Sequence, residues 1–284
     1  MSDLFEEELK RNEKVRTVML APLRGISILA YTYSGIILIV VVTYLMPSFV
    51  IIIRGMFHLY LSTNYTLPYS RGYGYFWTVP NNFLRHFHLL FEWWAIITHG
   101  VTNASIDCAF GFYIYLLAST MRAMTFRLTN PLATEKYSDV LRICVAKHQK
   151  LIQYRDTLKR IYSVIILWHI VTNAVLLCAL IYEALQLSDI TIRIIFNIIS
   201  YAVVKFLQTF TYAWYGTVIT NADENFRNGI YFSEWPNFGL NRHMRTNILL
   251  IMMQKPMIIK VFSVSVDVLI FTNFVNTTMS YFFY

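Results

Sequence analysis

The sequence has little charge and few cysteines for its length. Only 14% of the 284 residues are Asp, Glu, Lys or Arg, whereas 56% are hydrophobic and 17% are aromatic. Soluble domains carry about 25% charged residues, so this chain is too apolar for a soluble domain of ordinary composition. Its three cysteines are odd in number and form no CxxC pair, so they predict neither a disulfide framework nor a metal site.

The sequence also lacks the common catalytic and nucleotide-binding motifs. It contains no glycine-rich phosphate loop and no GxSxG, and His86 and His88 lack the i, i+4 spacing of a zinc protease. We therefore expect no enzymatic activity and no cofactor. The net charge of +8 comes from basic residues in loops between uncharged runs, not from one basic face, so a nucleic-acid partner is not expected.

Five long apolar runs predict an all-α, polytopic transmembrane bundle. Each is long enough for the roughly 20 residues that a helix needs to cross the hydrocarbon, and none alternates as β-barrel strands do. We expect one membrane domain with spanning segments at about 26–53, 87–121, 161–182, 194–222 and 257–284.

The basic residues predict the orientation of these spans. Segments 1–25, 122–160 and 223–256 contain 5, 9 and 4 Lys and Arg residues, whereas 54–86 and 183–193 contain 3 and 1. By the positive-inside rule the first three segments are cytosolic. The amino terminus is then cytosolic, and an odd number of spans places the carboxyl terminus outside.

Polar residues inside the spans are candidates for function because a charge at mid-bilayer costs at least about 2.5–3.5 kcal/mol. Asp107, Lys205 and Asp267 either line a hydrated pathway or form hydrogen bonds between helices, and the sequence favours neither. The polar residues of the last span either line a pore or join neighbouring helices. The candidate pore-lining residues are Asp267, Asn273, Asn276, Thr277 and Ser280.

Aromatic and sulfur side chains concentrate toward the predicted outer halves of several spans. Such side chains can form an apolar pocket for a small uncharged ligand. An interfacial aromatic belt gives a similar distribution and explains Trp93 and Trp94 better. The candidate ligand-binding residues are Tyr44, Met46, Phe91, Trp94, Ile97, Tyr201 and Phe206.

The basic segment 138–160 contains no Gly or Pro and places Leu141, Val145 and Ile152 at helical spacing. We expect a helix that continues below the membrane from the third span. Its positive face is suited either to anionic lipid or to contact with another subunit.

The carboxyl-terminal third resembles the insect odorant receptor family. Gln208, aromatic residues and Gly216 match the end of the family's sixth helix, and Tyr231 and Trp235 match the pair that follows. Pro256 before the last span and Tyr281 near its end match the family's carboxyl-terminal pattern. The resemblance extends over nearly the whole chain. It aligns this chain with helices three to seven of a seven-helix family, so we expect the first two helices and a few carboxyl-terminal residues of the family pattern to be missing.

The resemblance implies a plasma-membrane, multi-pass receptor of olfactory sensory neurons. In that family a variable subunit binds a small volatile odorant in the outer half of the bundle and forms a heterotetrameric cation channel with a co-receptor subunit. The resemblance favours the pore interpretation of the last span and the subunit-contact interpretation of 138–160.

Three alternatives remain at this point. A gustatory receptor of the same fold would end in Thr-Tyr-x-x-x-x-x-Gln-Phe, where this chain has Ser280 and Tyr281. A G-protein-coupled receptor requires an external amino terminus, which the charge asymmetry opposes. A polytopic membrane enzyme or transporter is the third alternative, and an enzyme would need convergent catalytic residues that the sequence does not reveal.

The predicted orientation can be tested with epitope tags in intact cells. A tag beside Lys150 should bind antibody only after permeabilisation, because this segment is the most basic of the cytosolic set. A tag after Thr63, in a predicted external loop, is the matched control and should bind without permeabilisation. Surface staining of the Lys150 tag would exclude both the orientation and the receptor assignment based on it.

Overall fold

The computed structural model describes residues 5–6, 13–57, 83–131, 136–186, 192–233, 242–253, 256–261 and 264–280. Nearly all of these residues are helical, as the sequence predicts. The helices are α2 (Glu13–Phe57), α3 (Phe83–Thr129), α4 (Tyr137–Gln186), α5 (Ile192–Phe232), α6 (Arg242–Met253) and α7 (Val268–Ser280). Two short strands, β1 (Lys260–Val261) and β2 (Val264–Ser265), lie between α6 and α7.

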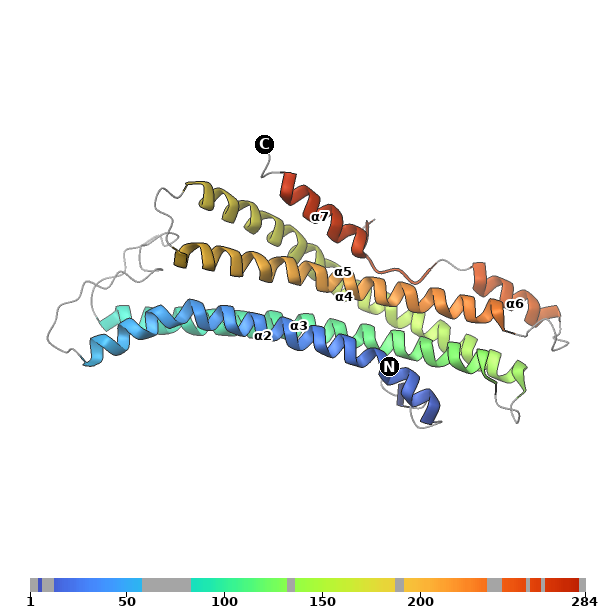
Figure 1. The fold of residues 1–284 in the computed structure, drawn as a ribbon. Helices are drawn as coiled ribbons and strands as arrows, with labels where there is room; N and C mark the ends of the chain where they lie inside the picture. The colour runs from blue at the N-terminus through green and yellow to red at the C-terminus, as the bar shows by residue number, and fades with distance from the viewer. Residues whose placement is uncertain are drawn as a thin grey trace.

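Four long helices run side by side along the molecule, and α7 lies against the outside of this bundle (Figure 1). Helix α3 is the central element, because its most extensive contacts are with α2 on one side and α5 on the other. Helix α4 packs mainly against α5, and α7 packs against α5 and α4.

Helix α4 confirms the prediction that the basic segment 138–160 continues without a break into the third span. It has 50 residues and neither Gly nor Pro interrupts it. At 1.5 Å per residue it is about 75 Å long, well over twice the roughly 30 Å thickness of the hydrocarbon. The helix must therefore extend far beyond the bilayer.

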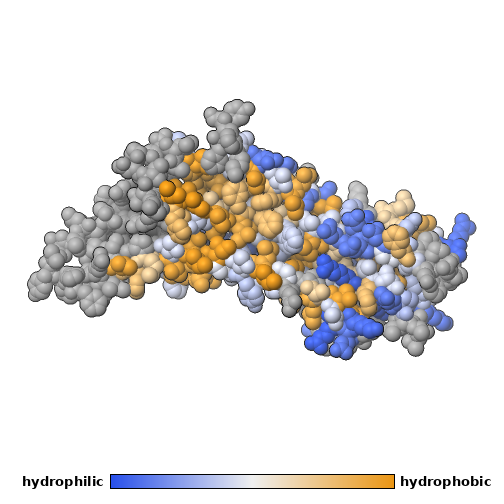
Figure 2. Space-filling model, in the orientation of Figure 1, coloured by the Kyte–Doolittle hydropathy of each residue, from blue (hydrophilic) through white to orange (hydrophobic). Residues whose placement is uncertain are grey.

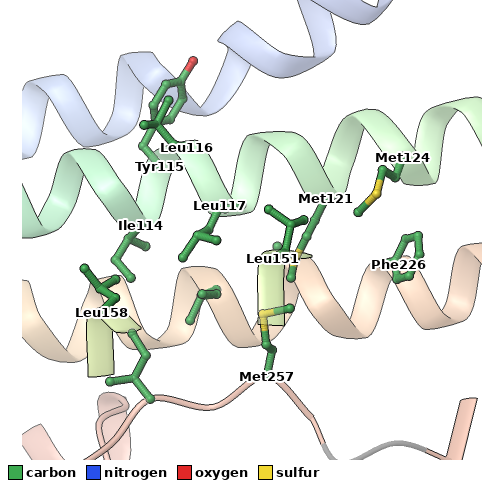
Figure 3. Close-up of a cluster of buried hydrophobic side chains, with 14 of the residues drawn as sticks. Ile114, Tyr115, Leu116, Leu117, Met121, Met124, Leu151, Leu158, Phe226 and Met257 are labelled. Carbon is green, nitrogen blue, oxygen red and sulfur yellow. The ribbon is translucent and has the colours of Figure 1, made fainter. Parts of the chain in front are cut away.

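The buried core lies at one end of the bundle. From Ile114 to Leu128 most side chains of α3 are buried, and they meet Leu151 of α4 and Phe226 of α5 (Figure 3). At the other end the helices expose large apolar residues, among them Ile39 at 62% and Val175 at 63%. Hydrophilic side chains cover the end of the bundle near α6, whereas apolar side chains cover its middle (Figure 2). This division is typical of a bundle partly solvated by lipid and partly by water.

Three of the described helices contain a segment that is long and apolar enough to cross a membrane. These segments are Glu13–Thr43, Trp93–Thr129 and Tyr137–Tyr182. Helix α5, with 41 residues, is about 60 Å long and exceeds the hydrocarbon thickness as well. The count of five spans and their orientation stay predictions.

The prediction of one continuous helix over 257–284 is wrong for its first part. Strands β1 and β2 form an antiparallel pair with Lys260 opposite Ser265, and α7 begins only at Val268. The β-branched residues that alternate through this segment favour extended backbone. Asp267 then starts the helix, because its Oδ1 accepts a hydrogen bond from the Ile270 amide at 3.1 Å, as an N-cap does.

Candidate functional site

The carboxylate of Asp107 is the centre of a polar cluster in the bundle. Asp107 lies on α3 and is only 2% exposed. Its Oδ2 accepts hydrogen bonds from the Tyr33 hydroxyl of α2 at 2.5 Å and from Gln208 Nε2 of α5 at 3.0 Å. The Tyr212 hydroxyl, also on α5, donates to Oδ1. Asp107 therefore joins three helices, which supports the helix-packing alternative for this residue.

Helix α4 completes the cluster through His169 and Asn173. His169 Nδ1 lies 3.2 Å from Gln208 Nε2, and Asn173 Nδ2 donates to Gln208 Oε1 and to Thr209 Oγ1, both at 3.2 Å. Gln208, a residue of the family motif, thus contacts both Asp107 and α4. We name the set Tyr33, Asp107, His169, Asn173, Gln208 and Tyr212 the polar hub.

Sequence reasoning found Asp107 and Gln208 but missed the other members of the polar hub. A usable signal was present, because His169 and Asn173 lie four residues apart, as do Gln208 and Tyr212, and each pair occupies one face of its helix. Tyr33 gave no such signal, since nothing in its surroundings distinguishes it from other tyrosines of the first span.

Lys205 lies one turn before the polar hub on α5 and is partly buried. Its Nζ stands 5.4 Å from the ring centroid of Tyr201, a favourable position for an ammonium group. Among the described residues no carboxylate lies within 4.0 Å of this Nζ.

The predicted ligand-binding residues all lie on one side of the polar hub along the helix axes. Those on α2 follow Tyr33 in the sequence, those on α3 precede Asp107, and those on α5 precede Gln208. Because α2 runs antiparallel to α3 and α5, all of them lie toward the same end of the bundle. The α2 and α3 members are exposed: Met46 at 50%, Phe91 at 69%, Trp94 at 68% and Ile97 at 43%. Tyr201 and Phe206 of α5 are half-buried, and the side chain of Tyr44 lies outside the described residues.

The predicted pore-lining residues of α7 separate into a base and a face. Asp267 lies at the base, where it caps the helix and accepts a hydrogen bond from Ser265 Oγ at 2.7 Å. The other four share an exposed face, whereas Phe274 and Thr278 on the opposite side are buried against the bundle. The exposed residues are Asn273, Asn276, Thr277 and Ser280.

The remaining motif residues have different surroundings. Gly216 is buried against the chain that leads to α7, and Tyr231 is 59% exposed at the end of α5, with its ring edge against Phe232. The Pro256 carbonyl accepts a hydrogen bond from the Ile258 amide at 2.9 Å. Trp235 and Tyr281 lie outside the described residues.

Removal of the Asp107 carboxylate should destabilise the protein strongly. In Asp107→Ala the buried donors of Tyr33, Tyr212 and Gln208 lose their acceptor, and each unpaired donor costs about 1–3 kcal/mol. We expect a lower melting temperature in detergent and a smaller monodisperse fraction on size exclusion. Asp156→Ala, which removes an exposed carboxylate from α4, is the control and should behave as the parent chain does. A parent-like melting temperature for Asp107→Ala would show that the polar hub contributes little.

Comparison with known proteins agrees with the resemblance found in the sequence. The family model described as the 7tm odorant receptor matches residues 1–279. Odorant receptor Or2 of Anopheles gambiae is 28% identical over 143 residues, which are 50% of this chain and 37% of that relative. The match therefore spans well under half the length of that relative.

Solved structures show the same fold. Olfactory receptor OR5 of the insect Machilis hrabei superposes with a TM-score of 0.73 at 14% identity, over 96% of this chain and 68% of that one. Its complex with eugenol superposes with a TM-score of 0.68, over 96% of this chain and 69% of that one. The helical bundle, the family-model match over nearly the whole sequence and these relatives lead to one conclusion: this multi-pass membrane protein belongs to the odorant receptor family, a family of receptors and not of enzymes.

Proposed function

We propose that the chain is an odorant-binding subunit that gates a non-selective cation channel together with a co-receptor subunit in the plasma membrane of olfactory sensory neurons. Membership of the odorant receptor family supports the receptor part of this proposal. The exposed polar face of α7 is the single observation that carries the channel part.

This face cannot be stable against lipid. The side-chain amides of Asn273 and Asn276 and the hydroxyls of Thr277 and Ser280 are exposed on one side of the helix. The opposite side, with Phe274 and Thr278, is buried. An amide without a hydrogen-bond partner in hydrocarbon costs several kcal/mol, on the order of 4–8 kcal/mol for transfer to an alkane. The face therefore needs water or another subunit, and a water-filled pore between subunits supplies both.

The proposed ligand is a small, largely apolar molecule that binds at the end of the bundle beyond the polar hub. The solved OR5 relative is described in complex with eugenol. The exposed aromatic side chains of Phe91 and Trp94 offer apolar surface there, which suits a volatile organic ligand. A ligand that binds the open arrangement more tightly than the closed one shifts the population toward the conducting state.

Whole-cell recording tests this function. Cells that express the chain with an odorant receptor co-receptor subunit should give an inward current when a panel of volatile compounds, eugenol included, is applied. Cells that express either subunit alone provide the control. Absence of any odorant-evoked current, in cells where surface labelling shows that the chain reaches the plasma membrane, would contradict the proposal.

The α7 face can be tested by thiol labelling without a known odorant. Asn276→Cys and Thr277→Cys should react with a membrane-impermeant, charged thiol reagent when the chain is assembled with the co-receptor, because a water-filled pore dissolves the reagent. Thr278→Cys is the matched control. The Thr278 side chain is only 3% exposed, so a cysteine at this position should react slowly. The parent chain, with Cys108, Cys144 and Cys178, gives the background rate. Equal rates at all three substituted positions would contradict a pore on this face.

A further inference from the structure

The described residues between α6 and α7, 256–261 and 264–267, do not form a surface loop. Met257, Ile259, Val261 and Val266 are each no more than 4% exposed and belong to the main hydrophobic core. Met257 and Leu151 of α4 belong to the same buried cluster, part of which Figure 3 draws. We name residues 256–261 and 264–267 the lead-in segment, because they lie between the core and the first turn of α7.

The start of the lead-in segment is fixed to the bundle by Asp223 of α5. The Met257 amide donates to Asp223 Oδ2 at 2.8 Å, Arg227 donates to the same oxygen at 2.5 Å, and His148 of α4 lies 3.2 Å from Oδ1. Burial raises the pKa of Asp223, but the hydrogen bonds from His148 and Met257 and the charge of Arg227 outweigh burial and hold it below its usual range. The ionised carboxylate is therefore the favoured state at neutral pH.

The end of the lead-in segment lies against Gly216, two turns back along α5. A Cβ atom added at Gly216 would stand 1.7 Å from the carbonyl oxygen of Val266 and 2.8 Å from its carbonyl carbon. Because the obstructing atoms are backbone, no side-chain rotation can relieve the overlap. Glycine is thus required at this position for the observed path of the chain.

The next residue, Thr217, binds the first residue of α7. Thr217 Oγ1 accepts a hydrogen bond from the Val268 amide at 3.3 Å and donates to the Ala213 carbonyl at 3.1 Å. The first amides of a helix have no partner within the helix, so the Thr217 hydroxyl satisfies one that would otherwise be free. Gly216 and Thr217 together form what we name the α7 seat.

Beyond its first turn, α7 is held to α5 differently. Phe271 meets Phe210 with ring centroids 5.4 Å apart, and Phe274 meets Phe206 at 6.0 Å, both edge to face. Among the described residues no hydrogen bond joins this part of α7 to another helix. Aromatic edge contacts tolerate sliding, whereas the seat combines a hydrogen bond with direct backbone contact.

We propose that Gly216 and Thr217 are positioning residues for the pore helix, and that they fix its base to α5 so that a displacement of α5 tilts α7 about the seat. This inference rests on the proposed pore role of α7. Helix α5 suits the task, because Gln208 and Tyr212 on the same helix belong to the polar hub. Gln208 lies a little over two turns before Gly216, and Tyr212 lies about one turn before it. Movement of α5 at the ligand end thereby reaches α7 through one rigid element.

Substitutions in the seat, read out by thiol labelling of Asn276→Cys, test the proposal without a known odorant. Thr217→Val keeps the shape and removes the acceptor, and Gly216→Ala pushes Val266 away. Loss of one hydrogen bond costs about 1 kcal/mol, which changes the equilibrium between two positions of α7 by about fivefold. We therefore expect the labelling rate of the cysteine at position 276 to change by about that factor. Thr217→Ser retains the hydroxyl and should label at the parent rate.

Thr220→Val is the matched control for a general loss of stability. Thr220 is on the same helix, and its hydroxyl bonds only the Gly216 carbonyl within that helix, at 3.0 Å. It should label at the parent rate. An unchanged rate in a folded Thr217→Val chain, or an equal change in Thr220→Val, would overturn the proposal; melting temperatures confirm that each variant is folded.

Recording from the same variants with the co-receptor separates this inference from the proposed function. If the parent gives odorant-evoked current, Thr217→Val should reduce the maximal current per surface subunit by about fivefold, and Thr220→Val should not. If the parent chain gives no current but the labelling rate at position 276 changes in the seat variants, the proposed role of the seat is supported and the channel function is rejected. If the parent conducts and the seat variants give the same maximal current as the parent, the proposed role of the seat is rejected and the channel function is retained.

Discussion

The structure depends on one constraint, that a polar group surrounded by hydrocarbon must find its partners within the protein. Long unbroken helices meet this constraint for the backbone. The polar hub meets it for the Asp107 carboxylate and its donors, whereas Asn173 Oδ1 is buried without a hydrogen-bond partner among the described residues. Asp107 is the clearest case, since a carboxylate with three donors from two other helices is satisfied without a basic partner. Among the described residues no hydrogen bond joins the exposed polar face of α7 to another helix, which supports the proposal that this face meets water or another subunit.

The position of α5 connects these features. One of its faces supplies Gln208 and Tyr212 to the polar hub, and further along the helix Gly216, Thr217 and Asp223 hold the chain that leads to α7. The helix thus contacts both the region proposed for the ligand and the base of the proposed pore helix. In a receptor channel these two regions must be coupled, and here a single helix can provide the coupling by rigid displacement.

Much of the fold could be predicted from the sequence, because the signals were long-range averages. Uncharged runs predicted the helices, and the absence of Gly and Pro in 138–160 predicted the continuous α4. The lead-in segment was missed because a hydrophobic run shows no difference between a membrane helix and a buried extended strand. Asp267 was interpreted as a pore residue for the same reason; its capping role depends on where the helix begins, which a hydropathy pattern does not show.

The burial of the carboxyl-terminal part of α3 also determines which solvent stabilises each part of the protein. Ala123, Met124 and Leu128, which follow the predicted span 87–121, are covered by other helices toward the hydrophilic end of the molecule, so ordinary water-driven burial acts there. At the opposite end the helices expose apolar surface, and lipid gives no comparable drive for association. The two parts of one continuous helix consequently contribute differently to the heat-capacity change of unfolding and to the sensitivity to urea. A change of bilayer composition acts directly only on the part that faces lipid.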